Sequence, residues 1–428
     1  MKKIKIIPAV AAVTISVLLL LTGCQNSQTT TNANSVSGIQ NTSVTISAED
    51  MFSSRDYETG YDESTAREIT ISDSNSNVEI KEEGVYIISG SAEDGSITVD
   101  APDTDKVQIL LNGVSIESKS SAVLYVKSAD KVFVTLLKGT ENTLSNSTAF
   151  KTGNDNIDGV IFSKSDITFN GEGTLTVNST TGHGIVGKDD VKFTSGTYNI
   201  TAASHGVDAN DSIRISNATF NITSTKDGFH AENNDDNEKG YIYIESGTFE
   251  ITSSDDAIHA TTYLQISGGT LNITAAEGLE ATVIKIDGGT ININASDDGI
   301  NAAQKSNIAT PTVEINGGSI TIVMGAGDTD GVDSNGDIVI NGGTVNVTGN
   351  SSFDYDGKGE INGGTVIVNG SEVTTLPNQF GGGFGGKGGP GGRGGMPGGR
   401  GWDNQNDTIT SATPNADTNG NLPTPPTV

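Results

Sequence analysis

The sequence predicts an all-β protein built as a single parallel β-helix, a solenoid of about 22-residue coils with three short strands in each coil. Composition is the first observation behind this prediction. Only 33% of the 428 residues are hydrophobic and 5% are aromatic, whereas glycine contributes 55 residues, which argues against a compact helical protein. The second observation is a Gly-Thr phrase that recurs about every 22 residues, a period typical of solenoids and too short for helical repeats.

The balance of charge excludes one class of partner. The chain carries 53 acidic and 24 basic residues, for a formal net charge of −29. Such an acidic surface repels nucleic acid and attracts cations or neutral surfaces, so we expect no nucleic-acid partner.

The first 23 residues resemble a bacterial lipoprotein signal peptide. A basic start is followed by an apolar run at residues 6–21, and the run ends in "LTGC" at Cys24. In that pattern the chain is cut before Cys24, and the lipidated cysteine holds the protein on the extracellular face of the bacterial cell membrane. An uncleaved anchor is the alternative, although Pro8 interrupts a stretch that is already short for a membrane span. Because Cys24 is the only cysteine, disulfides cannot hold the fold.

Polar, low-complexity sequence flanks the region that can fold. Residues 24–49 are rich in Ser, Thr, Asn and Gln, as expected of a lipid anchor followed by a flexible linker. Residues 377–428 form a Gly-rich tail with too little apolar surface to pack. The β-helix is therefore expected within residues 50–376, as one domain and a monomer.

Each repeat is expected to contain three strands. In "IKIDGGTINI", Ile284, Ile286, Ile291 and Ile293 alternate with polar residues, and the glycine pair marks a bend between two strands. A third strand follows an Asp-Gly turn in "DDGINAA". The Thr or Ser of the phrase stands at positions 174, 197, 219, 248, 270, 290, 319, 344 and 365.

Aligning the turns produces two columns of polar residues. The position before the turn glycine or alanine carries Ser121, Asp158, His183, His205, Asp227, Asp256, Glu277, Asp298, Asp330 and Asp356. The next outward position carries Asp208, His230, His259, Glu280, Asn301 and Asp333. Turn chemistry alone explains many of the aspartates, but it does not explain the glutamates or the histidines.

Stacked carboxylates repel one another at a spacing of about 4.8 Å, so a cation is expected between them. Calcium fits best, because it accepts many oxygen ligands in flexible geometry. The expected ligands are Asp227, Asp255, Asp256, Glu277, Glu280, Asp297, Asp298, Asp330 and Asp333. His230 and His259 also make zinc worth weighing, but carboxylates are in the majority and no thiol is near.

An outward row along the first strand of the coils is a candidate polymer-binding surface. It contains Lys192, Arg214, Tyr243, Gln265 and Lys285. Tyr243 is expected to be the best exposed ring, and the carbohydrate-binding residues are expected to be Tyr243, Lys285, His230 and His259. Neutral cellulose would be met mainly by polar ladders such as Asn199, Asn221, Asn272 and Asn292.

Long phrases of the chain resemble the bacterial carbohydrate-binding-domain family of secreted lipoproteins, known from cellulose-degrading clostridia. They include "FSSRDYETGYDES", "GYIYIESGTFEITSSDDAIHA", "ASDDGINAAQKS" and "SSFDYDGKGEINGGTVIVNG", and the resemblance runs from about residue 50 to residue 373. It implies a right-handed parallel β-helix similar to that of pectate lyases. It also implies bound calcium and binding of plant cell-wall polymers such as cellulose and polygalacturonate.

Three functions are compatible with these features. The favoured one is noncatalytic binding of plant cell-wall polysaccharide by a calcium-bearing β-helix. The second is a calcium-dependent polyuronate lyase, in which Lys226 or Arg214 would abstract the proton. The third is a structural surface adhesin in which calcium only staples the coils.

Overall fold

The computed structural model describes residues 50–378, apart from 152, 154 and 327–328. The predicted signal peptide, Cys24, the linker to residue 49 and the tail from residue 379 lie outside the described residues. The chain divides into two units, Met1–Gly382 and Gly383–Val428, and all described residues belong to the first. Within them there is no helix long and apolar enough to cross a membrane.

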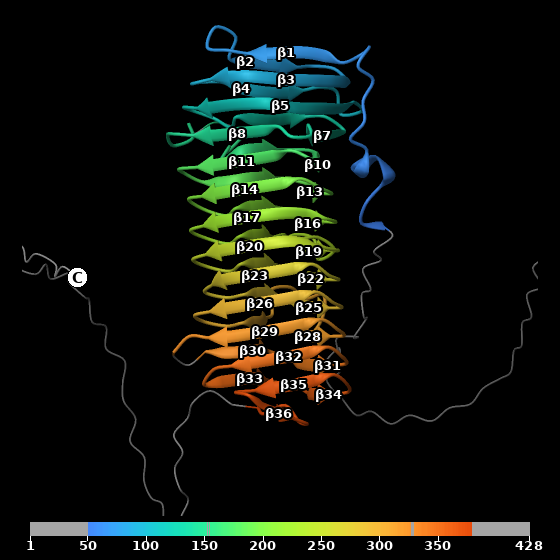
Figure 1. Ribbon diagram of the computed structural model, residues 1–428, viewed down its shortest axis with the longest axis vertical. Helices are drawn as coiled ribbons and strands as arrows, with labels where there is room; N and C mark the ends of the chain where they lie inside the picture. Colours follow the sequence, from blue (N-terminus) through green and yellow to red (C-terminus); the bar gives the residue numbers. More distant parts are fainter. Residues whose placement is uncertain (1–49, 152, 154, 327–328, 379–428) are drawn as a thin grey trace, which may run out of the picture. The chain divides into compact units, whose positions relative to one another are not determined.

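The described part of the chain is almost entirely β-strand, with one 3₁₀ helix, η2 (Ser54–Tyr57). The strands form one sheet of 24 strands and one of 12 strands. Figure 1 shows them as a tall stack in which successive repeats lie one below another.

The 24-stranded sheet contains two long ladders of parallel strands and a few strands that join or end them. The first ladder contains β7 (Lys131–Leu136), β10 (Asp166–Gly171), β13 (Asp190–Phe193), β16 (Ser212–Ile215), β19 (Tyr241–Ile244), β22 (Tyr263–Ile266), β25 (Val283–Ile286), β28 (Thr312–Ile315), β31 (Asp337–Ile340) and β34 (Gly359–Ile361). The second ladder contains β8 (Glu141–Asn146), β11 (Thr174–Ser179), β14 (Thr197–Ala202), β17 (Ala218–Ser224), β20 (Gly247–Ser253), β23 (Thr270–Ala275), β26 (Thr290–Ala295), β29 (Ser319–Met324), β32 (Thr344–Thr348) and β35 (Thr365–Val368). The remaining strands are β1 (Arg67–Ile71), β3 (Gly84–Ala92), β5 (Lys106–Ser118) and β36 (Ser371–Val373).

The 12-stranded sheet is a single parallel ladder. It contains β2 (Asn77–Ile80), β4 (Ser96–Asp100), β6 (Leu124–Ser128), β9 (Gly159–Ser163), β12 (His183–Gly187), β15 (Val207–Ala209), β18 (Phe229–Ala231), β21 (Ile258–Ala260), β24 (Leu279–Ala281), β27 (Ile300–Ala302), β30 (Asp330–Ser334) and β33 (Ser351–Tyr355).

The prediction of a single parallel β-helix with three strands in each coil is wrong, because the strands belong to two large sheets of 24 and 12 strands. The physical reason is visible at β5. This strand of 13 residues pairs with β7 through Lys106–Leu111 and with β8 through Ser115–Ser118, so it joins two ladders into one sheet. The sheet is not wholly parallel either, since β36 pairs antiparallel with β35.

The predicted alternation of apolar and polar residues sets the register of the ladders. In β23 and β26 the buried residues alternate with exposed ones, and Ile273 lies opposite Ile293. Identical positions of successive repeats therefore stack on each other, which places the apolar side chains in one continuous core.

The core lies between the two sheets. Phe220 of β17 stacks on Tyr198 and Phe249, with ring centroids 5.1 and 5.4 Å away. It also meets the edge of Phe229, which comes from β18 of the other sheet, at 5.0 Å. All four rings are fully buried, as expected for inward-facing aromatics.

An N-terminal segment, residues 51–58, covers part of the first ladder and is defined here as the N-terminal strap. Asp56, fully buried, binds Lys131 Nζ through Oδ1 at 2.7 Å. Thr168 Oγ1 donates to the same oxygen at 2.8 Å. Further along, Arg214 donates to the Met51 carbonyl oxygen at 3.3 Å. The strap therefore seals a surface that the repeats alone would leave open (Figure 1).

Candidate functional site

The second of the two predicted polar columns lies along the 12-stranded sheet in the expected order. Parallel pairing joins Asp208 to His230, His230 to His259, His259 to Glu280, Glu280 to Asn301 and Asn301 to Asp333. The alignment of the first column is wrong at two places: His183 pairs with Gly159 rather than with Asp158, and Asp330 pairs with Ser351, whereas Asp356 follows the end of β33. The turns there differ in length, which shifts the residue that precedes the strand.

Backbone hydrogen bonds between successive turns explain why Asp-Gly recurs. The N–H of Gly206 donates to the Asp227 carbonyl oxygen at 2.9 Å, and the N–H of Gly228 donates to the Asp256 carbonyl oxygen at 3.0 Å. A Cβ on Gly228 would lie only 2.6 Å from the carbonyl oxygen of Ala257 in the next repeat. The small residue allows this close approach, which in turn aligns the side chains before it into a column.

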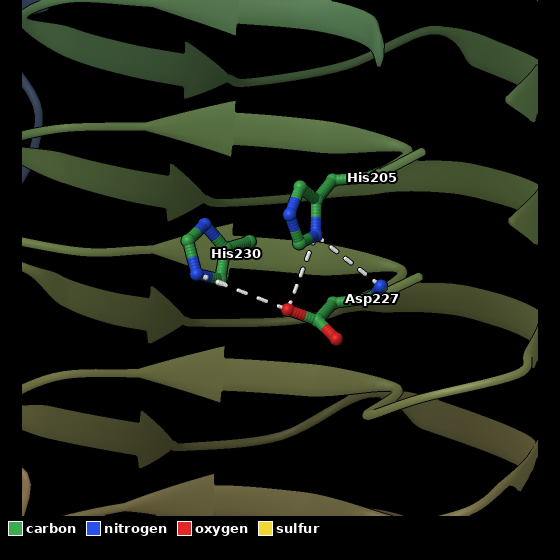
Figure 2. A group of neighbouring side chains, drawn as sticks. All are labelled: His205, Asp227 and His230. Atoms are coloured by element: carbon green, nitrogen blue, oxygen red, sulfur yellow. Dashed lines mark hydrogen bonds and ion pairs between the residues drawn. The ribbon is translucent and has the colours of Figure 1, made fainter. Parts of the chain in front are cut away.

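Four imidazole rings, two from each column, lie in a row; the first three are stacked and the fourth is tilted. Ring centroids lie 5.0 Å apart between His183 and His205, 4.2 Å between His205 and His230, and 5.0 Å between His230 and His259. Figure 2 shows His205 and His230 converging on Asp227. His205 Nδ1 lies 3.1 Å from Asp227 Oδ2, and His230 Nε2 lies 3.9 Å from the same oxygen.

Carboxylates hold the stacked histidines from several sides. His230 Nδ1 lies 2.6 Å from Asp208 Oδ1. His259 Nδ1 lies 2.9 Å from Asp256 Oδ2 and 2.7 Å from Glu280 Oε2. Burial works against charge on His259, but these two carboxylates raise its pKa to about 10, so the ring is a cation at neutral pH.

Burial, by contrast, lowers the pKa of His183 to about 4, which leaves that ring neutral at physiological pH. His183 and His259, which come from the two different columns, therefore differ in charge at neutral pH. The difference follows from the neighbours: His259 contacts two carboxylates, at 2.9 and 2.7 Å, whereas Nε2 of His183 lies 3.9 Å from Asp158.

Lys305 neutralises part of the middle of the column. Its Nζ lies 2.7 Å from Glu280 Oε1. Although burial opposes ionisation of Glu280, His259 and Lys305 together hold its pKa below the usual range. Lys305 comes from the loop between β27 and β28, which is longer than the corresponding loop between β24 and β25. A lone lysine in an insertion beside an acidic column is the signal that would have found it.

Further along, Glu277, Asp298 and Asp333 form no ion pair with a basic side chain of the described residues, although the charge of Lys305 acts on Glu277 from a distance. Burial and the charges of Asp256, Glu280 and Asp298 raise the pKa of Glu277 to about 8. Burial and neighbouring carboxylates likewise raise the pKa of Asp298 to about 6 and that of Asp333 to about 7. We define Glu277, Asp298, Asn301 and Asp333 as the acidic segment. Its carboxyl groups resist ionisation because they are partly buried and lie near other carboxylates.

An unsatisfied oxygen lies in the acidic segment. Asn301 Nδ2 donates to Glu277 Oε2 at 3.0 Å, while Asn301 Oδ1 is buried and finds no donor within the described part of the chain. A buried acceptor without a donor is costly. Carboxylate and amide oxygens are donors that calcium prefers, so these residue types fit calcium. Of the three carboxylates, only Glu277 belongs to a group of converging donors, with Asp256 and Glu280.

Three groups of side chains bring donor atoms within 4.8 Å of one another in the described residues. The groups are His205, Asp227 and His230; Asp227, Asp256 and His259; and Asp256, Glu277 and Glu280. Of the expected metal ligands, Asp255 and Asp297 are exposed at the surface, and Asp330 is half-buried with its N–H bonded to Asp298 Oδ1.

The expected polymer-binding row is largely covered. Tyr243 is only 1% exposed and packs against Phe52 of the strap at a ring distance of 6.4 Å, so it cannot offer a ring to a ligand. Arg214 is held by Asp190 at 2.8 Å. Lys285 is half-buried and lies 3.5 Å from Asp287. The strap carries no repeat phrase, so its position over this row could not be read from the periodicity.

The two residues considered as bases of a lyase are not brought together. Lys226 is exposed in the turn before Asp227, at the 12-stranded sheet. Arg214 lies on β16 of the 24-stranded sheet and is occupied by Asp190 and Met51.

A polar groove crosses the second ladder of the 24-stranded sheet. It has a volume of about 490 Å³, spans β14, β17, β20, β23 and β26, and is lined in part by Asn199, Asn221, Glu250, Asn272 and Asn292. Asn221 Nδ2 donates to Asn199 Oδ1 at 2.8 Å, and Asn292 Nδ2 donates to Asn272 Oδ1 at 2.9 Å. This ladder offers hydroxyl-binding groups in a line along the stack.

A family model and a curated relative name the same family. The family described as "Carbohydrate-binding domain-containing protein" matches residues 74–329 and 278–375. A protein of the same description from Acetivibrio thermocellus is 45% identical over 174 residues, which is 40% of this chain and 61% of that relative. A solved structure described as the polysaccharide lyase-like protein from C. thermocellum, gadolinium derivative, is 30% identical, with a TM-score of 0.46 over 53% of this chain and 92% of the other.

Proposed function

The chain belongs to the carbohydrate-binding domain-containing protein family, which supports a carbohydrate-binding role, and from this we propose that it binds plant cell-wall polysaccharide without cleaving it. The polymer we favour is polygalacturonate, held through calcium at the acidic segment. The chain spans about three fifths of the length of the curated relative it matches. The choice of polygalacturonate and calcium is therefore argued from the side chains of this chain and not from that relative.

The observation that carries the proposal is the uncompensated charge of the acidic segment. Its carboxyl groups have raised pKa values, and Asn301 Oδ1 lacks a donor. Glu277, Asp298, Asn301 and Asp333 would hold calcium, with Asp256 and Glu280 beside them. Calcium supplies positive charge that both the protein carboxylates and the carboxylates of a polyuronate can share.

A neutral glucan such as cellulose is a second candidate ligand, and the polar groove favours it. The groove runs across five successive strands of one ladder, which suits a linear polymer. Its lining is made of amide and hydroxyl groups, which hydrogen-bond sugar hydroxyls but provide no flat aromatic platform.

The test is retention of the full chain on insoluble pectate and on cellulose, each with calcium and with a chelator. We expect retention on pectate that the chelator abolishes and that the pair Glu277→Gln with Asp333→Asn also abolishes. Retention on cellulose that is insensitive to the chelator would assign the groove instead. If neither polymer retains the protein while calcium still raises its Tm, the chain is a structural adhesin and the proposal fails.

The same samples test for lyase activity. A polyuronate lyase releases unsaturated uronides that absorb ultraviolet light, so a rise in absorbance with soluble pectate would overturn the noncatalytic assignment. We expect no rise, because Lys226 lies exposed in a turn at the 12-stranded sheet, whereas Arg214 lies on β16 of the other sheet and is paired with Asp190.

We further propose that the protein acts at the extracellular face of the bacterial membrane, as a monomer anchored through lipidated Cys24 after removal of residues 1–23. Residues 25–49 would then act as a spacer, residues 50–376 as the binding domain and residues 377–428 as a tail. Cys24→Ser should release the protein from the membrane fraction into the medium. Retention of that variant in the membrane would favour an uncleaved anchor.

A further inference from the structure

We propose a second metal site of different chemistry, a zinc-class site formed by His205, Asp227 and His230. It goes beyond the proposed function, because it uses neither the acidic segment nor the groove. Donor atoms of its three residues all lie within 4.8 Å of one another. Their side chains converge from adjacent repeats, as Figure 2 shows.

The orientation of His230 is the first independent sign of a metal ligand. Its Nδ1 lies 2.6 Å from Asp208 Oδ1, so the ring donates from that nitrogen. This leaves Nε2 as the atom that faces Asp227 Oδ2, at 3.9 Å, and Glu232 Oε2, at 3.7 Å. A carboxylate that binds one ring nitrogen while the other faces a group of donors is the arrangement that surrounds metal-bound histidines.

The contact between His205 and Asp227 is the second sign. His205 Nδ1 accepts the N–H of Asp227 at 3.3 Å and also lies 3.1 Å from Asp227 Oδ2. One ring nitrogen cannot accept from the N–H and donate to the carboxylate together. A cation between His205 Nδ1 and Asp227 Oδ2 resolves this conflict, because Nδ1 then binds the cation instead of accepting the N–H of Asp227.

A metal ion also suits the stacked rings of His205 and His230 better than protonation of both rings does. The rings of His205 and His230 are 4.2 Å apart and nearly parallel, so protonating both would place two positive charges face to face. One divalent ion held by both rings replaces two such charges with a single centre. His205 and Asp227 are buried, with exposed fractions of 9% and 4%, which limits competition from water.

The donor set selects zinc over calcium. Two imidazole nitrogens and one carboxylate oxygen match the ligands that zinc takes in tetrahedral sites, whereas calcium takes oxygen alone. Glu232, whose carboxylate lies 3.7 Å from His230 Nε2, or a water molecule would supply the fourth ligand. Asp227 therefore belongs to this site rather than to the calcium ligands expected from the sequence.

Calorimetric titration of the metal-stripped full chain with zinc chloride, in excess calcium, tests the site. We expect one zinc ion per chain and at least about a tenfold loss of affinity in His205→Gln and in His230→Gln. Asp208→Asn, which removes only the positioning carboxylate, should weaken zinc binding by about tenfold as well. Bound cobalt should show the visible absorption of a tetrahedral ion, and Asp208→Asn should shift it.

His183→Gln is the matched control, because His183 stacks on His205 but lies outside the donor group. Its zinc affinity should stay within about threefold of the wild type. Far-UV circular dichroism and the Tm in chelator show whether each variant is folded, and Asp208→Asn carries the test if a histidine variant is not. Equal losses in His183→Gln and His230→Gln, displacement of zinc by calcium, or no zinc binding would overturn the proposal.

Discussion

Replacing Glu277 by glutamine should stabilise the calcium-free protein at alkaline pH, although the change removes a charge from the proposed calcium site. In the folded protein, burial and three neighbouring carboxylates raise the pKa of Glu277 to about 8, against 4.5 for the free side chain. A raised pKa means that the stability this group contributes is fully present below pH 4.5 and is lost as the pH rises through about 8. Glutamine keeps an oxygen that can accept from Asn301 Nδ2 but cannot ionise.

The size of the effect follows from the shift. The difference between 4.5 and about 8 corresponds to about 5 kcal/mol of unfolding free energy at about 1.4 kcal/mol per pH unit. Glu277 is half-buried, so solvent screening reduces this to about 2 kcal/mol. For a folded region of this length, that is a rise in Tm of about 3 °C.

Thermal unfolding at pH 5 and pH 8.5, with chelator and with calcium, is the assay. In chelator we expect no difference from the wild type at pH 5 and the full gain at pH 8.5. With calcium at pH 8.5 the order reverses, because only the wild type keeps the full set of metal ligands. Glu250→Gln, an exposed carboxylate of the groove, is the control and should show no gain that depends on pH. A loss of Tm in chelator at pH 8.5, or an equal gain at both pH values, would refute the reasoning.

Three further predictions test other parts of the molecule. Asn272→Ala should reduce retention on cellulose several-fold if the groove binds glucan, whereas Asn346→Ala, at the equivalent position of β32 outside the groove, should not. Asp56→Asn should lower the free energy of unfolding in urea by about 3 kcal/mol, because it leaves Lys131 without its buried partner. In the wild type, Lys131 and other donors overcome burial and hold the pKa of Asp56 at about 2, so the same stability should be lost as the pH falls from about 4 through 2. Unchanged urea midpoints would contradict both expectations. Phe220→Ala should cost about 3–5 kcal/mol in the same assay, since its ring stacks between rings from adjacent repeats, and a loss under 1 kcal/mol would show that the core closes around the gap.

The sequence predicted the rungs of the stack better than it predicted the sheets. Alternating apolar residues and recurrent turn glycines determine which positions of successive repeats meet, and the pairings of Asp208 with His230 and of His259 with Glu280 follow that order. The division into sheets depends on β5, whose 13 residues run without the bend that separates the two strands of later repeats. A prediction built on the consensus repeat therefore missed it.

Contacts between segments distant in the sequence were also beyond the periodic pattern. Asp56 meets Thr168 across 112 positions, and nothing in the strap resembles the repeat it covers. The expected exposure of Tyr243 was wrong for that reason. Lys305 was missed because its contact with Glu280 depends on the path of an inserted loop, which strand periodicity does not describe.

The distribution of positive charge along the column explains why two kinds of metal site are proposed on one ladder. A repeat that stacks in register places like side chains over one another, so each carboxylate rung needs a cation from elsewhere. Around Glu280 the chain provides its own, through His259 and Lys305. At Asp227 it provides imidazole nitrogens, which turn an acidic rung into a mixed donor set suited to zinc. In the acidic segment it provides neither, and the raised pKa of Glu277 reports the uncompensated charge. Calcium binding is therefore expected at the acidic segment, where no histidine or lysine side chain of the described residues pairs with the carboxylates. The affinity for calcium should rise as the pH increases from 6 to 8, because these carboxyl groups ionise in that range.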